Sequence, residues 1–300
     1  MIYSSKDNWA IGEDVRLLRS ELSNAPITYK VFPSVFDISL PAIASASMRS
    51  IFFNERYLVI LSGSLTRMLI KFPFKMFLLR RFATLGVRSI SDMRHLESQK
   101  VRVMHTPYFI DQVVFNCTQD RRRISENLTI GSFQRDTTNK GKIKYEKSPD
   151  FLLESLGKIL SESSICVVLT AYRRSWLLER LGRQKFSNIE LHVRGEDHRP
   201  VSRKELSDMY RSIDVYFMLS RDEGGPHSIL ECLFTNTPVV CLNEGVAVDI
   251  FFGETNVVNN IHDIDLSLIL DVLNSWPEIR ERALSRYFLP VEKFKFLISQ

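Results

Sequence analysis

The sequence predicts an α/β protein with two domains, of which the second is built on a doubly wound parallel sheet. Its 300 residues suggest about two domains at roughly 150 residues each. In the second half, short runs of β-branched or apolar residues alternate with segments of helical spacing. Strands that are separated by helices pair in parallel and carry helices on both faces, so this alternation indicates the doubly wound arrangement.

The elements of the second half are well marked. Strands are expected at Leu128–Phe133, Ile165–Thr170, Ile189–Val193, Val215–Leu219 and Val239–Leu242. Helices are expected between them at Phe151–Leu160, Trp176–Phe186, Glu205–Arg211 and Ile229–Phe234. Ser148 followed by Pro149 is typical of a capping residue before a proline at the first helical position. Ser202 and Glu205 have the spacing of a capping box, which marks a second helix start.

The first half predicts a shorter α/β domain. Its strand candidates are Ile27–Val31, Tyr57–Leu61, Val87–Ile90 and Val101–His105, with helical stretches near Val15–Leu22 and Met76–Leu85. A polar, basic stretch near Phe115–Arg123 is the expected boundary. The predicted domains are therefore residues 1–118 and residues 119–300, and the C-terminal helices of the second can pack back on the first.

Composition narrows the class of protein. Hydrophobic residues make up 44% and charged residues 25%, as in ordinary globular proteins. The most apolar segment, Tyr57–Leu79, is interrupted by Arg67, Lys71 and Lys75, so no membrane span is expected. The N-terminus lacks the features of a signal peptide, which favours a cytoplasmic location. The four cysteines lack metal-ligand spacing and are interpreted as buried free thiols, and no metal site is expected.

The net charge of +5 is unevenly distributed along the chain. Six basic residues and no acidic one lie between Arg67 and Arg88, interleaved with apolar side chains. One interpretation is a basic amphipathic surface in peripheral contact with an anionic membrane, at its inner face. The other is a solvated helix face that backs onto the core, and Pro73 argues against one continuous helix. No pattern for binding nucleic acid accompanies the charge, so nucleic acid is excluded as a partner.

The segment from Ile213 to Glu231 carries the clearest chemical signal. A buried strand ending at Ser220 is followed by the turn Arg221–Pro226 and then by a helix. Ligands of open parallel sheets bind beyond the carboxyl ends of the strands, where such loops lie. Gly224 and Gly225 allow the backbone to approach a ligand closely. The helix start, with its unpaired N–H groups, is suited to bind phosphate.

Two carboxylates frame this turn. Glu223 lies at the strand end and Glu231 lies one turn into the helix, so both can reach the same site. Carboxylates accept hydrogen bonds from hydroxyl groups, as a sugar or a ribose requires. Two acids at this spacing mean little in a chain with 35 acidic residues. Their placement around the turn makes the pattern specific.

This segment resembles family 4 glycosyltransferases of the GT-B fold, whose signature is two glutamates with seven residues between them. The proline-led strand Thr237–Cys241 and the glycine turn Asn243–Val246 are similar to the segments that follow that signature. Upstream, Ser202–Asp214, Ile130–Arg135 and Lys147–Asp150 resemble other conserved segments of the family, with Ser148 where the family has glycine. The resemblance extends over about Val101 to Ile250 and covers the first hundred residues poorly.

The resemblance implies two Rossmann-like domains facing a cleft, the N-terminal one short. It also implies an enzyme, a retaining glycosyltransferase that uses a nucleoside-diphosphate sugar without a metal or other cofactor. The carried-over phosphate ligands are Arg135 and Lys147, with Lys140 as a rival for the second role. Asp136 and Asp150 are the acids with which these two cations could instead pair.

The same resemblance implies roles for the residues of the signature turn. Glu223 is expected to hold hydroxyls of the donor sugar and Glu231 those of the ribose. Donor contacts of the backbone or side chains are carried over to Gly224, Gly225, Pro226, His227, Ser228 and Ile229. The implied acceptor is a cell-surface polysaccharide or a lipid-linked glycan.

The first half departs from the family pattern. His105–Asp111 is similar to the interdomain segment of the family but lacks its Asn and Gly. The glycine-rich loop and the histidine that many members carry in this half have no counterpart. An alternative function is therefore a non-catalytic domain that binds a sugar nucleotide or serves as a partner subunit. Another GT-B enzyme, such as a phosphorylase or an epimerase, is a further alternative, although no pattern for a pyridoxal lysine is present.

Overall fold

The structure is a computed structural model of the chain. It describes residues 16–17, 29–32, 39–53, 55–61, 65, 69–70, 72–117, 127–137, 142–184, 186, 188–221 and 227–299. The chain divides into two compact units. Unit 1 comprises Met1–Ile110, Asp222–His227 and Ser285–Gln300, and unit 2 comprises Asp111–Arg221 and Ser228–Leu284. Within the described residues, no helix combines the length and the apolar character that a membrane span requires.

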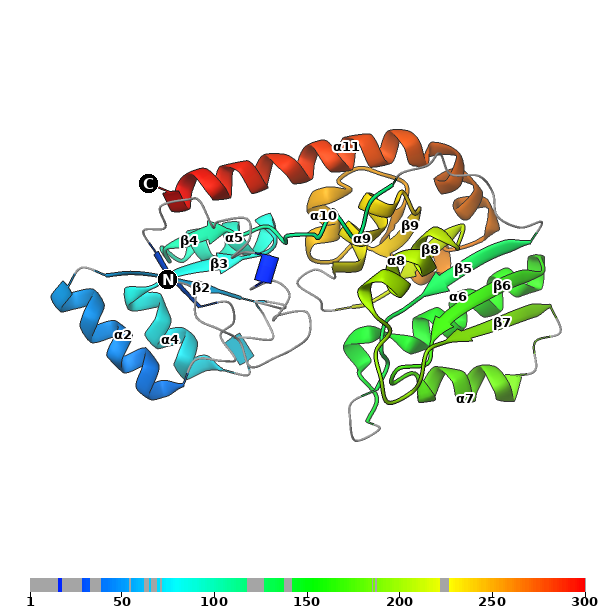
Figure 1. Cartoon of the computed structure of the whole chain (residues 1–300), viewed down its shortest axis with the longest axis horizontal. Coiled ribbons are helices and arrows are strands. Elements are labelled where there is room, and N and C mark those ends of the chain that lie inside the picture. Colours follow the sequence, from blue (N-terminus) through cyan, green and yellow to red (C-terminus); the bar gives the residue numbers. More distant parts are fainter. Residues whose placement is uncertain are drawn as a thin grey trace. The chain divides into compact units, whose positions relative to one another are not determined.

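Unit 1 is built on a parallel sheet (Figure 1). Its strands lie in the order β1 (Tyr29–Phe32), β2 (Arg56–Ile60), β3 (Thr84–Val87) and β4 (Val103–His105). The helices that connect them include α2 (Leu40–Phe53), α4 (Pro73–Phe82) and α5 (Ile90–Ser98). All three neighbouring strand pairs are parallel, which confirms the α/β class predicted for the first half.

The third strand of unit 1 lies earlier in the chain than predicted. Helix α4 buries Met76, Leu79 and Phe82 and ends there, and β3 begins at Thr84. Ile90, predicted to end a strand, instead begins α5, because the Ser89 hydroxyl accepts a hydrogen bond from the Asp92 N–H at 3.1 Å. This is the capping geometry that fixes a helix start.

Unit 2 contains a six-stranded parallel sheet. Its strands lie in the order β10 (Val257–Val258), β9 (Val239–Leu242), β8 (Val215–Met218), β5 (Leu128–Ser132), β6 (Ile165–Thr170) and β7 (Ile189–Arg194). Its helices are α6 (Pro149–Glu162), α7 (Ser175–Gln184), α8 (Arg203–Arg211), α9 (His227–Thr235) without its first residue, α10 (Val246–Ile250) and the part of α11 (Leu266–Ser299) up to Leu284, with short 3-10 turns η2 (Tyr145–Lys147) and η3 (Ile261–Asp263). The five predicted strands and four predicted helices are all present.

The strand order of unit 2 reverses between β5 and β8. Strands β5, β6 and β7 follow one another toward one edge, and β8, β9 and β10 follow toward the other. Such a reversal creates a crevice outside the carboxyl ends of the two central strands, and ligands of open sheets bind there. The residues that follow Ser132 and Met218 are therefore the ones expected to contact a ligand.

Close packing fixes the central strands of unit 2. A Cβ added at Gly131 on β5 would lie 2.3 Å from the Ile213 Cδ1 atom, so any larger residue here would force the buried Ile213 side chain to shift. The Asp214 carboxylate accepts a hydrogen bond from the Thr129 N–H at 2.8 Å and holds the starts of β5 and β8 together. The register of the two strands, and with it the position of their carboxyl ends, is thus specified by local contacts.

Candidate donor-binding site

The carboxyl ends of β5 and β8 are joined by a side-chain hydrogen bond. The Ser220 hydroxyl, after β8, donates to the Gln134 side-chain oxygen, after β5. Gln134 is followed by the half-buried Arg135, and Ser220 is followed by Arg221. The predicted phosphate ligand Arg135 and the strand that leads into the signature turn are therefore neighbours. Glu223, Gly224, Gly225 and Pro226 lie outside the described residues, as does Lys140.

Asp136 is the acid that was considered as a partner of Arg135, and it forms a hydrogen bond to the start of α7. Its Oδ2 atom accepts a hydrogen bond from the Leu177 N–H at 2.9 Å, and the carboxylate is buried. Burial raises its pKa, while the charge of Arg174 acts in the opposite direction. The Arg174 guanidinium is itself buried and donates to the Ser132 carbonyl at 3.0 Å and hydroxyl at 2.8 Å. This buried cation at the end of β5 was not predicted from the sequence.

Lys147 ends the η2 turn and is half-buried, immediately before α6. The next residue, Ser148, has φ 45° and ψ 54°, which is the left-handed region. Residues with a Cβ atom adopt this conformation at a cost in free energy, whereas glycine does not. This explains why the family that the sequence resembles has glycine at this position. Pro149 is the first residue of α6, as predicted. Ser148 is the N-cap residue of α6, as predicted, but its side chain makes no capping hydrogen bond to the helix.

The Ser148 side chain instead binds Arg221. Its hydroxyl oxygen accepts hydrogen bonds from the backbone N–H of Arg221 at 3.2 Å and from the Nε of its guanidinium at 2.9 Å. Arg221 also forms an ion pair with Asp150 at 2.5 Å and lies over the Phe151 ring at 3.7 Å. Arg221, the first residue of the turn, is thus fixed to the start of α6, next to Lys147 in the sequence. No sequence pattern indicated this role of Arg221.

A cavity of about 320 Å³ adjoins Arg221 within unit 2. Its lining residues come from the start of α6, the end of β8 and the turns after β9 and β10: Phe151, Arg221, Leu242, Asn243, Glu244, Asn259, Asn260 and Ile261. The Asn243 amide donates to the Asn259 side-chain oxygen at 2.8 Å and orders the rim. Amide and carboxylate groups of this kind suit the binding of hydroxyl groups.

The start of α9 offers hydrogen-bond donors to an anion. Ser228 is 8% exposed, and its hydroxyl has no hydrogen-bond partner among the described residues. Ile229 is fully buried and anchors the helix against the core. The N–H groups of a first helical turn, together with a hydroxyl such as that of Ser228, suit the binding of an anion. His227, which belongs to unit 1, lies with its ring edge-on to Tyr108 at 4.6 Å between the ring centroids.

Glu231 is buried, with 7% of its surface exposed, and its Oε2 atom accepts a hydrogen bond from the Tyr210 hydroxyl at 2.8 Å. Tyr210 lies in an aromatic cluster with Phe133 and Tyr216, at 5.1 Å from each ring. Burial and the Glu231 carboxylate raise the Tyr210 pKa well above its usual value. The tyrosine therefore remains protonated and donates to Glu231.

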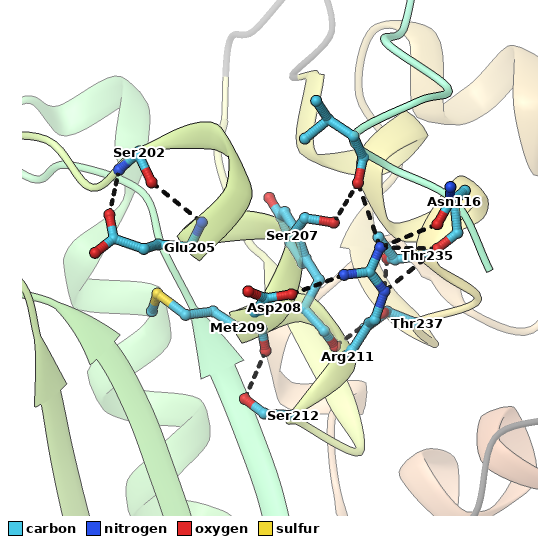
Figure 2. Close-up of polar contacts among 12 residues, drawn as sticks. Asn116, Ser202, Glu205, Ser207, Asp208, Met209, Arg211, Ser212, Thr235 and Thr237 are labelled. Atoms are coloured by element: carbon cyan, nitrogen blue, oxygen red, sulfur yellow. Dashed lines mark hydrogen bonds and ion pairs between the residues drawn. The ribbon is translucent and has the colours of Figure 1, made fainter. Parts of the chain in front are cut away.

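Helix α8, which carries Tyr210, is held at both ends (Figure 2). At its start the predicted capping box is confirmed: the Glu205 N–H donates to the Ser202 hydroxyl at 3.2 Å, and the Ser202 N–H donates to the Glu205 carboxylate at 2.7 Å. At its end the Arg211 guanidinium donates to the Asn116 carbonyl at 2.9 Å. The Thr237 hydroxyl donates to the carbonyl of Tyr210 at 2.9 Å. The position of the Glu231 carboxylate thus depends on contacts from three separate segments.

The cysteines were also considered as candidate metal ligands in the sequence. All four are free, as predicted, and three are buried, but Cys117 is exposed, contrary to the prediction. One group of described residues, Cys166, Glu190 and His192, has ligand-type atoms within 4.8 Å of one another. They lie on β6 and β7, where Cys166 pairs in register with Glu190. None of the predicted donor-site residues belongs to this group.

Comparison with known proteins agrees with the predicted fold. Residues 120–256 match the model of the family Glycosyl transferases group 1. This range contains Arg135, Lys147 and Glu231, and the other predicted site residues as well. No curated protein matches the sequence significantly.

Solved structures resemble the chain over nearly its whole length. Sucrose-phosphate synthase from Thermosynechococcus elongatus superposes with a TM-score of 0.67 at 11% identity, covering 98% of this chain and 79% of that one. An alpha,alpha-trehalose-phosphate synthase (UDP-forming) from Burkholderia vietnamiensis gives 0.64 at 15% identity, with coverages of 91% and 70%. A variant of TarM from S. aureus, in complex with fondaparinux, alpha-GlcNAc-glycerol and UDP, gives 0.62 at 13% identity, with coverages of 91% and 55%.

These neighbours define the fold as GT-B. The chain spans about half the length of TarM, at 55%. The chain thus has the GT-B fold, and its residues 120–256 are similar to the family Glycosyl transferases group 1.

Proposed function

We propose that the chain transfers a glycosyl group from a nucleoside-diphosphate sugar to an acceptor, with retention of configuration at the anomeric carbon. The observation that carries this proposal is the grouping at the carboxyl ends of β5 and β8. The Gln134–Ser220 hydrogen bond joins the two strand ends, with Arg135 following one and Arg221 the other. The family match supports the proposal, and the TarM structure contains UDP.

In the proposed mechanism, cations and helix N–H groups stabilise the leaving diphosphate. Arg135 and Lys147 neutralise its charge, and the N–H groups at His227–Ile229 with the Ser228 hydroxyl donate hydrogen bonds to it. Stabilisation of developing charge by preorganised groups commonly contributes more to catalysis than any other single effect. With these groups in place the reaction is proposed to need neither a metal ion nor another cofactor.

The two glutamates of the signature orient the donor. Glu223 is proposed to accept hydrogen bonds from the donor sugar, and Glu231 from the ribose. The hydrogen bond from Tyr210 uses part of the acceptor capacity of Glu231, because a carboxylate has about four lone-pair sites. Gly224, Gly225 and Pro226 are proposed to bring the backbone against the sugar. The proposed acceptor is a cell-surface polysaccharide or a lipid-linked glycan, and the proposed location is cytoplasmic.

A thermal-shift panel of UDP-, GDP- and ADP-sugars tests the donor site. The wild type is expected to be stabilised by at least one donor, and Glu231→Ala is expected to lose most of that shift. Glu278→Ala, which removes an exposed carboxylate on α11, is the matched control and is expected to retain it. If no sugar nucleotide stabilises the wild type, the donor-site proposal is wrong.

Turnover and stereochemistry are tested on the donor found in that panel. Release of the nucleoside diphosphate is measured first, and the anomeric configuration of the product is then read by NMR. We expect a product with the configuration of the donor. An inverted product would refute retention while leaving the transferase intact.

A non-catalytic sugar-nucleotide-binding domain is the second candidate function. It is favoured by one observation: the family match begins at residue 120 and leaves the first half of the chain unmatched. It predicts donor binding without release of nucleoside diphosphate. The thermal-shift and turnover measurements together therefore distinguish the two functions.

A further inference from the structure

Two neighbouring helices of unit 1 expose large apolar side chains. The α2–α4 face is defined here by the exposed residues Leu40, Met48 and Ile51 of α2 and Phe74 and Phe77 of α4, with exposed fractions between 46% and 70%. The two helices contact each other and lie side by side (Figure 1). The strands follow one another in the order β1-β2-β3, so right-handed crossovers place both helices on the same side of the sheet.

Each helix presents one face to the core and the other to solvent. In α2, Ile43 and Ala46 are buried, and Leu40, Met48 and Ile51 are exposed. Leu40, Ala44, Met48 and Ile51 follow helical spacing and form one exposed stripe. Helix α4 buries Met76, Leu79 and Phe82 and exposes Phe74 and Phe77. The exposed apolar groups are therefore grouped on these surfaces rather than scattered over them.

All charged residues of the two helices are positively charged. Helix α2 contains Arg49, helix α4 contains Lys75, Arg80 and Arg81, and neither helix contains an acidic residue. The guanidinium of Arg81 lies 4.3 Å from the centre of the Phe77 ring. The neighbouring acid Glu55, at the start of β2, lies 4.0 Å from Arg49. Basic groups thus border the exposed aromatic groups.

This combination suits an anionic lipid surface. Helices that rest in a bilayer interface carry aromatic and aliphatic side chains on one side and Lys or Arg beside them. A second copy of the chain is a poorer occupant, because a two-fold interface would bring the same positively charged surface against itself. An anionic headgroup layer instead complements the charge while the hydrocarbon boundary takes the apolar side chains.

We propose that the α2–α4 face docks the protein on an anionic lipid bilayer. Phe74, Phe77 and the exposed aliphatic residues of α2 insert at the level of the headgroups. Lys75 and Arg81 bind lipid phosphate groups at the same depth. This docking requires neither the donor site nor turnover, so its test stands apart from that of the proposed function.

Co-sedimentation of the full chain with vesicles tests the proposal. The wild type is expected to bind vesicles of phosphatidylglycerol mixed with phosphatidylcholine, and to bind phosphatidylcholine alone at least tenfold more weakly. The Lys75→Gln/Arg81→Gln variant is expected to lose about 25-fold in affinity, because each basic residue near an anionic surface contributes roughly fivefold. Phe74→Ser/Phe77→Ser is expected to lose at least tenfold, because two aromatic groups no longer insert.

Control variants lie on unit 2. Phe252→Ser removes a side chain that is 73% exposed, and Lys204→Gln removes an exposed charge on α8. Both are expected to bind vesicles as the wild type does. Circular dichroism and the Tm verify that every variant is folded. Absence of wild-type binding to anionic vesicles overturns the proposal, as does equal binding by all variants. A dimer in sedimentation velocity that the Phe74→Ser/Phe77→Ser variant abolishes, without vesicle binding, would assign the face to a second copy.

Discussion

The contact between Ser148 and Arg221 allows the effect of substitutions at Ser148 on the free energy of unfolding to be predicted. Ser148 has a left-handed backbone at φ 45°, which costs an L-residue about 1–2 kcal/mol. Its hydroxyl accepts two hydrogen bonds from Arg221, each worth about 0.5–1.5 kcal/mol. Ser148→Ala removes both bonds and keeps the backbone cost, so a loss of about 1–3 kcal/mol in the free energy of unfolding is expected. Ser148→Gly removes the same bonds but relieves the backbone, and is expected to be about 1 kcal/mol more stable than the alanine variant.

Urea denaturation measures these free energies, and a double-mutant cycle identifies the partner. Arg221→Met removes the Nε donor and keeps the backbone N–H of residue 221 in place. Combined with Ser148→Ala, it is expected to show a coupling energy of about 0.5–1.5 kcal/mol. If the Ser148 side chain instead made a capping hydrogen bond to α6, the effects of the two substitutions on the free energy of unfolding would be additive. A coupling energy below about 0.3 kcal/mol would therefore refute the contact described here.

Three further predictions concern the packing and the protonation of the fold. Tyr210→Phe leaves the buried Glu231 carboxylate without its phenol donor, so urea denaturation should show a loss of about 1–3 kcal/mol, with a smaller thermal shift by the donor sugar nucleotide. Gly131→Ala should destabilise by about 1–3 kcal/mol because the site has no room for a methyl group, whereas Gly182→Ala on α7, with open space around it, should stabilise by about 0.5–1 kcal/mol. Burial lowers the pKa of His105, so the folded state disfavours its protonated form, and the stability that the neutral ring contributes is lost as the pH falls below about 6.5. His105→Gln should therefore lose less stability than the wild type when the pH is lowered from about 7 to about 5, and equal losses would contradict this assignment.

The strands of unit 2 could be predicted because they are buried on both sides. Parallel strands that are covered by helices appear as short, continuous apolar runs. Strands β6 (Ile165–Thr170) and β9 (Val239–Leu242) accordingly have the bounds that the sequence predicts. Turn residues and capping residues bound these runs, and the capping box at Ser202 located the start of α8 to within two residues.

The full length of α11 and the start of β3 could not be predicted, because their sequences contain patterns that are typical of a different secondary structure. Helix α11 continues from Leu266 to Ser299 through Pro277 and Pro290, and proline inside a helix removes a backbone donor. Sequence patterns therefore indicate shorter helices there. In unit 1, the apolar spacing of α4 continues past Phe82 into β3, so the helix period did not indicate the strand that begins at Thr84. Tertiary packing decided both cases.

The candidate site likewise contains residues that could be predicted from the sequence and residues that could not. Arg135, Lys147 and Glu231 could be named because they belong to a recognisable pattern of residue types. Arg221 and Tyr210 could not, because each acts through a partner that is remote in the chain, as Arg221 does through Asp150, 71 positions away. Hydrogen bonds of this range depend on how strands and helices pack, which no local pattern encodes.

The support of Glu231 suggests how donor affinity can change without a change in any donor contact. A carboxylate that is buried and bound by a neutral phenol is held in one orientation before the ligand arrives, which lowers the entropy lost on binding. Tyr210 in turn depends on α8, which Arg211 ties to Asn116 and Thr237 ties to the Tyr210 carbonyl. Substitutions at these anchors should therefore weaken donor binding in proportion to the disorder they introduce at α8. Arg211→Met and Thr237→Val are expected to raise the donor Kd in the same direction as Tyr210→Phe and by less, since they leave the phenol in place.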